Sequence, residues 1–442
     1  MHATQVFAGY ADTFREQPLP DEVLHHAKRA VIDWYASLFP GLATPPVQLL
    51  EQALAEDLDH GGARLALGRR ATARTAALIN GTAAHAAEVD DSFRDAMYHP
   101  GAATIAAALA AAQDTRASGL QFLRGVVLGY EISTRIGVVM GRPHYKFWHS
   151  TGTVGTFGAA AAAGGIHGLD ATAFAHALAT SATFAAGLQQ AFRMDSMSKP
   201  LHAGRAAEAG LLAVTLARRG LTGSLDVLDG EAGLGQAMSI GPDWSQVGAT
   251  LGRDFHITRL TFKNHIGCGH TFAAIDGALA LQRQHGLAAA DIAKVHVATY
   301  RPALDIACYQ RPTTVNEARF SLSYVVASAL VHGSVRLAAY EPARLNDPAT
   351  RALMERLTVA VDPELDAAFP GQRAARIEIE TVDGRRLSHL QPNRKGDPEE
   401  PLSDEELEGK LIELATPVIG SDAAHALLAR LWALDSAPAL DW

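Results

Sequence analysis

The stretch "PDEVLHHAKRAVIDWYASLF", residues 20–39, is typical of an amphipathic helix and sets the character of the chain. Pro20 and Asp21 stand where a helix begins, and apolar residues follow at helical spacing: Val23, Leu24, Ala27, Ala30, Val31, Trp34 and Tyr35. The same pattern recurs farther along the chain, in residues 72–88, 103–115, 119–140, 172–192 and 202–220. Residues 1–250 therefore read as helix after helix, with many alanines and glycines that would let the helices approach closely. We predict a mainly α fold whose larger domain is all-helical.

The pattern changes near residue 290. Residues 292–300 alternate between apolar and polar side chains, as a half-buried strand does. Residues 356–363 are another strand candidate, and 374–391 form two β runs around Asp383-Gly384, a strong hairpin signal. After a polar linker, Ser403 and Glu406 have the spacing of a capping box at the start of a helix. We expect a smaller α+β domain over 268–399 and a helical domain formed by 1–267 with 400–442. The cleft between two such domains is the usual place for a small-molecule site.

Composition excludes several classes of protein. The 442 residues are 48% hydrophobic and 19% charged, which is typical of globular chains. With a net charge of −9 and no basic stripe, nucleic acid is not an expected partner. Two cysteines exclude a disulfide framework and suit a reducing cytoplasmic location. We find neither a signal peptide nor a run apolar enough for a membrane span.

One short segment, "AHAAEVDDSFRDAMYHPGAA" (84–103), gathers many titratable groups: His85, Glu88, Asp90, Asp91, Asp95 and His99. A metal site, an acid–base site and a solvated loop are all open readings. No His-Glu-x-x-His frame is present, which disfavours metal. In a structural reading the paired aspartates cap a helix or bind loop amides.

A second segment, residues 142–160, carries His144, Tyr145, Lys146 and His149 before a G-x-x-G-x-x-G run. A glycine-rich turn that opens a helix offers backbone N–H groups to an anion. The glycines can equally serve tight helix packing, and the spacing is not that of a dinucleotide-binding fingerprint.

A third segment contains Lys199 and Arg205. Lys199 could supply a fixed positive charge for a carboxylate, or a base if it is desolvated. Ser196 and Lys199 match a Ser-x-x-Lys hydrolase pattern, but the rest of that signature is missing. No doubly wound framework supports a pyridoxal-phosphate lysine.

A fourth segment, residues 261–281, places Lys263, His265, Cys268 and His270 before a helix. One cysteine among histidines could bind zinc or could simply be packed in a helix-entry loop. Tyr324 lies in an apolar run and is most simply a core residue. Taken together, these segments supply cations for a polycarboxylate substrate and imidazole, amine and phenol groups for proton abstraction without a metal.

Seven blocks in order, among them "NGTAAHAAEVDD", "HSTGTVGTFGAAAAAG", "SKPLHAGRAAEAG" and "TFKNHIGCGH", resemble the MmgE/PrpD family over residues 20–435. The resemblance implies a homodimer that needs no cofactor, with a helical domain, a smaller α+β lid and a site between them. It implies a small di- or tricarboxylate as substrate. It further implies that the chemistry involves His99, His149, Lys199, Lys263, His265 and Tyr324. Substrate contacts are expected from Glu88, Asp91, Ser92, Tyr145, Arg205, Cys268 and His270.

The chain departs from that family's dehydratase and decarboxylase pattern at three positions. Glu88 stands at the first acid, Ser92 at a threonine, and Cys268 where decarboxylases carry a histidine. These changes argue against cis-aconitate decarboxylation and make 2-methylcitrate a doubtful substrate. We expect a hydro-lyase that removes a proton α to a carboxylate, as well-known members do. An epimerase of an amino- or imino-dicarboxylate such as iminodisuccinate is the alternative, and a polycarboxylate-binding protein is the non-enzymatic one.

Overall fold

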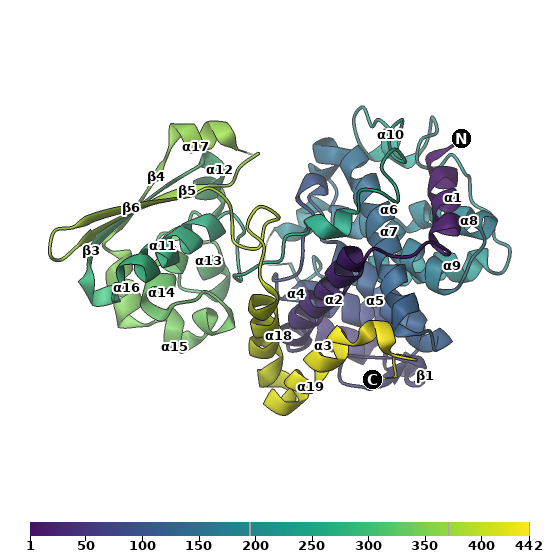
Figure 1. Cartoon of the computed structure of the whole chain (residues 1–442), viewed down its shortest axis with the longest axis horizontal. Helices are drawn as coiled ribbons and strands as arrows, with labels where there is room; N and C mark the ends of the chain where they lie inside the picture. The colour runs from purple at the N-terminus through teal and green to yellow at the C-terminus, as the bar shows by residue number, and fades with distance from the viewer. Residues whose placement is uncertain (194–195, 370, 442) are drawn as a thin grey trace. The chain divides into compact units, whose positions relative to one another are not determined.

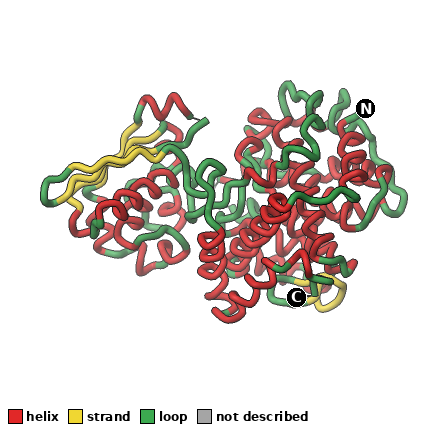
Figure 2. The backbone as a smooth tube through the Cα atoms, in the orientation of Figure 1, coloured by secondary structure: helices red, strands yellow, loops and turns green. Residues whose placement is uncertain are grey.

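A computed structural model describes residues 1–193, 196–369 and 371–441. The chain forms two compact units, one made of residues 1–261 and 403–442 and the other of residues 262–402. Helices dominate the first unit, and the strands of the second form one sheet (Figures 1 and 2). The mainly α fold class is therefore confirmed. Each unit is described by itself below.

The larger unit begins with a run of helices that follows the predicted order. Their bounds are α1 Ala3–Phe14, α2 Asp21–Leu42, α3 Pro45–Ala53, α4 Ala73–Ala86, α5 Pro100–Thr115, α6 Gly119–Tyr145, α7 Ser150–Ile166, α8 Ala171–Phe184, α9 Leu201–Ala217 and α10 Leu234–Met238. The C-terminal helices α18 (Asp404–Ile419) and α19 (Ser421–Trp432) complete the unit. Ser403 caps α18 through the predicted box, accepting from the Glu406 amide at 3.2 Å while the Glu406 carboxylate accepts from Ser403 N at 2.7 Å.

Helix α7 lies in the interior of the larger unit, packed against α5, α6 and α9. Small residues make this close packing possible. At Gly210 of α9, an added Cβ would lie 2.6 Å from the backbone nitrogen of Ala160 in α7. At Gly155 of α7, it would lie 3.1 Å from the Cβ of Ala103 in α5. The expectation that alanine and glycine bring the helices together is borne out at these positions.

The helical prediction for residues 1–250 is wrong in two places. Strands β1 (Leu58–Arg64) and β2 (Arg70–Ala71) form a short antiparallel hairpin between α3 and α4. Helix α8 ends at Phe184, short of the predicted 192, because Ala185 is already extended, with φ −65° and ψ 111°. Beyond it, Gly187 takes a left-handed φ of +132° and Leu188 pairs with Trp148 in a β-bridge. Alanine-rich composition alone conceals both features, since they depend on a glycine conformation and on distant pairing.

The smaller unit is built on a four-stranded sheet in the order β4-β3-β5-β6. The strands are β3 Ile292–Thr299, β4 Leu357–Val361, β5 Ala375–Thr381 and β6 Arg386–Gln391. Strand β3 runs parallel to β4 and antiparallel to β5. The predicted hairpin at Asp383-Gly384 is present as the β5–β6 turn, where Gly384 has a φ of +86°.

Helices surround this sheet and cover its apolar face. They are α11 Phe272–His285, α12 Arg301–Ile306, α13 Val315–Arg319, α14 Leu322–His332, α15 Pro342–Leu345, α16 Pro348–Met354 and α17 Pro363–Ala368. Helix α11 packs against β5 and β6, and alternate strand residues such as Val297, Ile377 and Ile379 are buried. This alternation is what the sequence pattern predicts.

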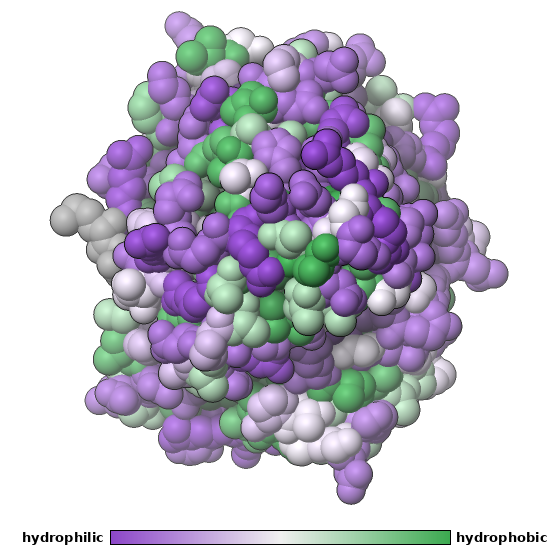
Figure 3. All heavy atoms as spheres, turned by 90° about the vertical axis from the view of Figure 1, so that its left-hand side faces the viewer, coloured by the Kyte–Doolittle hydropathy of each residue, from purple (hydrophilic) through white to green (hydrophobic). Residues whose placement is uncertain are grey.

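Polar side chains predominate on the face that Figure 3 turns toward the viewer, with apolar ones scattered between them. None of the helices among the described residues is both long and apolar enough to cross a membrane.

Candidate active site

The titratable segment singled out in the sequence includes the loop of residues 87–99, here called the His–Asp loop. It connects α4 to α5, and it turns at Glu88, which has a left-handed φ of +61°. Asp91 ties the loop to its surroundings: one carboxylate oxygen accepts from the Gly101 amide at 3.0 Å, and the other accepts from the Tyr130 hydroxyl at 2.8 Å. Burial, together with the charges of Asp33 and Asp90, raises the pKa of Asp91 well above its ordinary value. Asp91 thus bonds a helix-entry amide, as the structural reading of the sequence expects.

Asp90 gathers two histidines in the interior. Its Oδ2 lies 2.7 Å from Nδ1 of His85, and the same oxygen lies 3.4 Å from Nδ1 of His99. Nδ1 of His99 also lies 2.7 Å from the carbonyl oxygen of Asp91. A carbonyl only accepts, so Nδ1 of His99 carries a hydrogen, and the lone pair of a neutral ring then stands on Nε2. His99 is 20% exposed on its side chain whereas His85 is fully buried, so His99 is the member of the pair that small molecules can reach.

His149 and His202 lie beside this pair, and the four residues His85, His99, His149 and His202 are here called the histidine cluster. The Nδ1 atoms of His149 and His202 lie 3.0 Å apart, and the ring of His149 stacks at 5.4 Å from that of His85. Burial first, and then the charges of His85 and Lys199, lower the pKa of His149 well below its ordinary value. The same causes lower the pKa of His202 to about 4. Both rings are therefore neutral at pH 7, and a neutral imidazole can act as a base.

Lys199 brings a positive charge to this group. Its ammonium pairs with the carboxylate of Glu88 and lies 4.9 Å from the centre of the Phe192 ring. That ring also packs edge-on against His149 at 4.8 Å. Burial by itself lowers the pKa of Lys199, but the charge and hydrogen bond of Glu88 outweigh it, and the pKa is raised. Lys199 is thus a charged group beside neutral imidazoles.

The donor atoms of His85, Asp90 and His99 lie within 4.8 Å of one another, as metal ligands would. The same atoms are used in hydrogen bonds inside the cluster. A hydrogen on Nδ1 of His99 is incompatible with a metal on that nitrogen in this arrangement. The geometry is that of a carboxylate orienting two imidazoles, which suits acid–base chemistry.

Other predicted residues of the larger unit lie in different settings. Tyr145 is half-buried and contributes to the electrostatic environment of Lys199. The backbone of Ser92 forms a β-bridge with Thr261. Arg205 is half-exposed and pairs with Glu208, a carboxylate that also binds Arg74. A substrate contact from Arg205 stays a prediction, and it would have to compete with Glu208.

The remaining predicted residues belong to the smaller unit. Nε2 of His265 lies 2.8 Å from Asp276, and Nδ1 of His270 lies 2.9 Å from the Tyr300 hydroxyl. Burial is the main cause that lowers the pKa of His270 to about 3 and raises that of Cys268 to about 11. Lys263 is half-buried, and the hydroxyl of Tyr324 donates to the Ala339 carbonyl.

Tyr324 is fully buried, and its pKa is raised chiefly by burial. This setting matches the core role that its apolar neighbours suggest. A catalytic role for Tyr324 therefore remains a prediction from resemblance.

Sequence reasoning did not assign roles to two histidines of the cluster, His85 and His202. His85 is the last residue but one of α4 and stands five residues before Asp90, and His202, near the start of α9, follows Lys199 by three residues. Both spacings were visible in the sequence. The pairing of His149 with His202, however, joins α9 to the residue before α7 and depends on the tertiary fold.

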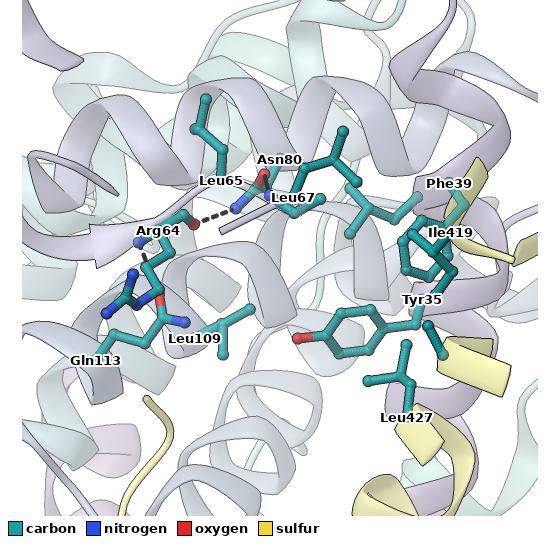
Figure 4. Close-up of a pocket in the computed structure, with 13 residues that line it drawn as sticks. Tyr35, Phe39, Arg64, Leu65, Leu67, Asn80, Leu109, Gln113, Ile419 and Leu427 are labelled. Carbon is teal, nitrogen blue, oxygen red and sulfur yellow. Dashed lines mark hydrogen bonds between the residues drawn. The ribbon is translucent and has the colours of Figure 1, made fainter. Parts of the chain in front are cut away.

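A separate cavity of about 270 Å³ lies elsewhere in the larger unit (Figure 4). Tyr35, Phe39 and Leu109 give it apolar walls. Its polar groups bind one another: Asn80 donates to the Arg64 carbonyl at 3.0 Å, and the Arg64 amide donates to Gln113 at 3.0 Å. No member of the histidine cluster lines it, so the cavity and the cluster are separate features of the larger unit.

A helical unit with a buried group of oriented imidazoles and a lysine is the setting of an acid–base enzyme. The chain matches the MmgE/PrpD N-terminal domain over residues 5–247 and the MmgE/PrpD C-terminal domain over residues 265–435. It therefore belongs to the MmgE/PrpD family, as the motifs indicate.

Curated relatives match along nearly the whole chain. A cis-aconitate decarboxylase-like protein, oryM, from Aspergillus oryzae is 28% identical over 95% of this chain and 92% of its own length. The cis-aconitate decarboxylase of Homo sapiens is 26% identical over 96% of this chain and 90% of its own length. That of Mus musculus is 27% identical over 96% of this chain and 89% of its own length.

Proposed function

We propose that this protein is a lyase that moves a proton at the carbon α to a carboxylate in a small di- or tricarboxylate. The observation that carries the proposal is the group of buried imidazoles around Asp90, with a hydrogen fixed on Nδ1 of His99 and a charged lysine close by. A proton α to a carboxylate is weakly acidic, so its removal needs both a base and a positive charge for the enolate that develops.

In this proposal the residues have different roles. Nε2 of His99, or His149, takes the proton, and Lys199 binds a substrate carboxylate and stabilises the developing charge. In a dehydration, the C–O bond then breaks. A second residue, which acts as the acid, protonates the departing hydroxyl, and this leaves as water. Lys263, His265 and Tyr324 remain candidates for that second acid and for further carboxylate contacts.

Decarboxylation is the second candidate. Of three curated relatives that align over most of their length, two are named cis-aconitate decarboxylase and one a cis-aconitate decarboxylase-like protein. There the C–C bond to a carboxylate breaks, carbon dioxide leaves, and an imidazolium protonates the carbanion. The same cluster could serve this reaction after taking up a proton. Glu88, Ser92 and Cys268 are the positions that favour a different substrate, and identities near 28% leave that choice open to experiment.

The test follows deuterium and products together. The protein is incubated in D₂O with 2-methylcitrate, malate, iminodisuccinate and cis-aconitate, and NMR records the α-carbon and any new signals. A new alkene from a hydroxy acid indicates dehydration, loss of a carboxylate indicates decarboxylation, and exchange without net product indicates epimerisation. Binding without exchange on every acid would contradict an enzyme of this type and support a polycarboxylate-binding protein.

A pair of lysine variants tests the roles. Lys199→Met removes the charge beside the cluster, and turnover is expected to fall by about 10²–10³. Lys146→Met is the matched control, since Lys146 is exposed on the surface and lies over the Phe147 ring. Equal activity of the two variants would show that Lys199 does not stabilise the reaction.

A further inference from the structure

Lys410 is a lysine whose buried position calls for an explanation. It stands on α18, in the C-terminal segment, and its side chain is 1% exposed. Its ammonium donates to Oδ1 of Asp33 on α2 at 2.5 Å and to the backbone carbonyl of Val89 at 2.8 Å. The second contact reaches the His–Asp loop from a helix more than three hundred residues away in sequence.

Stability alone does not account for such a lysine. Removing two charges from water costs about as much as their attraction returns, and apolar residues of similar volume often serve a protein core equally well. An apolar residue at position 410 could not donate a hydrogen bond to the carbonyl of Val89. This buried carbonyl needs a donor, because Val89 lies in a loop and has no helical or strand partner.

Val89 lies between two residues that contact the proposed site, Glu88 and Asp90. Glu88, on one side, takes the left-handed conformation and pairs with Lys199. Asp90, on the other side, orients His85 and His99. Because the peptide unit is planar, the carbonyl of Val89 and the nitrogen and Cα of Asp90 move as one rigid group. A hydrogen bond that holds this carbonyl also fixes where the Asp90 side chain begins.

The positive charge of Lys410 acts on a group of buried carboxyl groups next to Val89. Asp33, Asp90 and Asp91 are all buried, and both Asp33 and Asp90 raise the pKa of Asp91. An ammonium bound to Asp33 offsets part of that shared negative charge. The Asp90 carboxylate is the partner of Nδ1 of His85, and together with the Asp91 carbonyl it faces Nδ1 of His99, so its position bears on both rings.

We propose that Lys410 is a positioning residue for the active site: by holding Val89 and neutralising Asp33, it fixes Asp90 and thereby the hydrogen-bearing nitrogen of His85 and the orientation of the His99 ring beside it. The part of this inference that concerns turnover rests on the proposed function. The part that concerns the imidazoles does not, and it can be measured in the absence of any substrate.

The experiment compares two full-length variants that differ only at residue 410. Lys410→Met alone leaves the Asp33 carboxylate buried without its ammonium and could unfold the protein. Asp33→Asn leaves the Lys410 ammonium without its carboxylate but with its bond to Val89, so circular dichroism must first show that this variant is folded. It is then the reference, and Asp33→Asn with Lys410→Met, which removes both charges, is the test. Lys28→Met is the matched control, because Lys28 links α2 to Asp435 in the same C-terminal segment without contacting the His–Asp loop.

The first measurement is the ¹⁵N spectrum of histidine-labelled protein, with the two rings assigned through His85→Gln and His99→Gln. In Asp33→Asn and Lys28→Met we expect the wild-type pattern, with hydrogen on Nδ1 of both rings. In the double variant we expect a mixture of tautomers at His85, whereas the Asp91 carbonyl keeps hydrogen on Nδ1 of His99. A double variant that keeps the wild-type ¹⁵N pattern would overturn the proposal, whatever its activity.

The second measurement is turnover on the acid identified by deuterium exchange. Relative to Asp33→Asn, the double variant is expected to lose at least about tenfold in kcat with little change in KM, because the substrate-binding Lys199 is retained. Its pH profile should shift, whereas a purely structural lysine would lower activity without shifting it. If the wild type turns over none of the acids, the proposed function fails, but the ¹⁵N result still decides the role of Lys410.

Discussion

At the scale of single residues, the candidate site depends on which nitrogen of each imidazole carries hydrogen. A backbone carbonyl fixes the tautomer of His99: the Asp91 oxygen 2.7 Å from its Nδ1 can only accept, so this nitrogen carries the hydrogen. Burial keeps the rings of His149 and His202 neutral, and because their Nδ1 atoms lie 3.0 Å apart, one of these nitrogens carries a hydrogen and the other accepts it. In the proposed function the four histidines have different tasks: His99 or His149 takes the substrate proton, while His85 and His202 support the two rings.

The lowered pKa of His202 predicts a pH dependence of stability. Its folded pKa is about 4, below the ordinary 6.5, so the unfolded chain binds more protons between these values. The contribution to stability is complete above pH 6.5 and is lost as the pH falls toward 4. Between pH 7.5 and 5, His202→Gln should therefore lose about 1 kcal/mol less of its free energy of unfolding than the wild type does.

Urea unfolding at the two pH values measures this difference. His425→Gln, at an exposed position on α19, controls for the substitution itself. A wild type and a His202→Gln variant that lose the same free energy between pH 7.5 and 5 would show that His202 becomes protonated without cost in the folded protein.

At the scale of elements, glycine determines how closely α9 approaches α7. A methyl group at Gly210 would lie 2.6 Å from the Ala160 nitrogen, whereas at Gly409 of α18 it would meet nothing within 4 Å. We expect Gly210→Ala to lower the free energy of unfolding by about 1–3 kcal/mol through overpacking. Gly409→Ala should raise it by about 0.5–1 kcal/mol, since alanine favours a helix.

Chemical denaturation of both variants tests this contrast, because the two substitutions are identical and both occur within helices. If Gly210→Ala is as stable as the wild type, then α7 and α9 separate at no cost, and the close packing between them is not needed.

Local signals allowed most elements to be predicted. The capping box at Ser403 and the hairpin at Asp383-Gly384 depend on residues that are neighbours in sequence, and both are present. The β1–β2 hairpin and the early end of α8 depend on pairing or on the φ of one glycine, and periodicity does not report either. In the site, motifs indicated His99, His149 and Lys199. The bond of Lys410 to Val89 joins segments that only the folded chain brings together.

At the scale of the whole molecule, the chain passes from the larger unit to the smaller one and back. The segment 403–442 returns to the larger unit, where α18 packs on α2 and buries Leu407, Leu411 and Leu414. The sequence places all five tryptophans within 1–261 or 403–442. Tryptophan fluorescence therefore reports on the larger unit alone, whereas circular dichroism reports on both.

Each unit has a core of its own, so each can be destabilised separately. Leu411→Ala removes a fully buried side chain from α18, and Ile377→Ala does so in β5 of the smaller unit. Such truncations cost about 2–5 kcal/mol. We expect Leu411→Ala to lower the fluorescence midpoint in urea. Ile377→Ala should shift only part of the circular dichroism change and leave the fluorescence midpoint in place.

The two probes distinguish independent units from a single cooperative one, for which all transitions would coincide. If Ile377→Ala lowers the fluorescence midpoint as much as Leu411→Ala does, unfolding of the smaller unit must destabilise the larger. Lys263, His265 and Tyr324 would then belong to the same cooperative structure as the histidine cluster. If the midpoints move separately, the units are energetically independent, and the folding of the histidine cluster does not depend on the smaller unit.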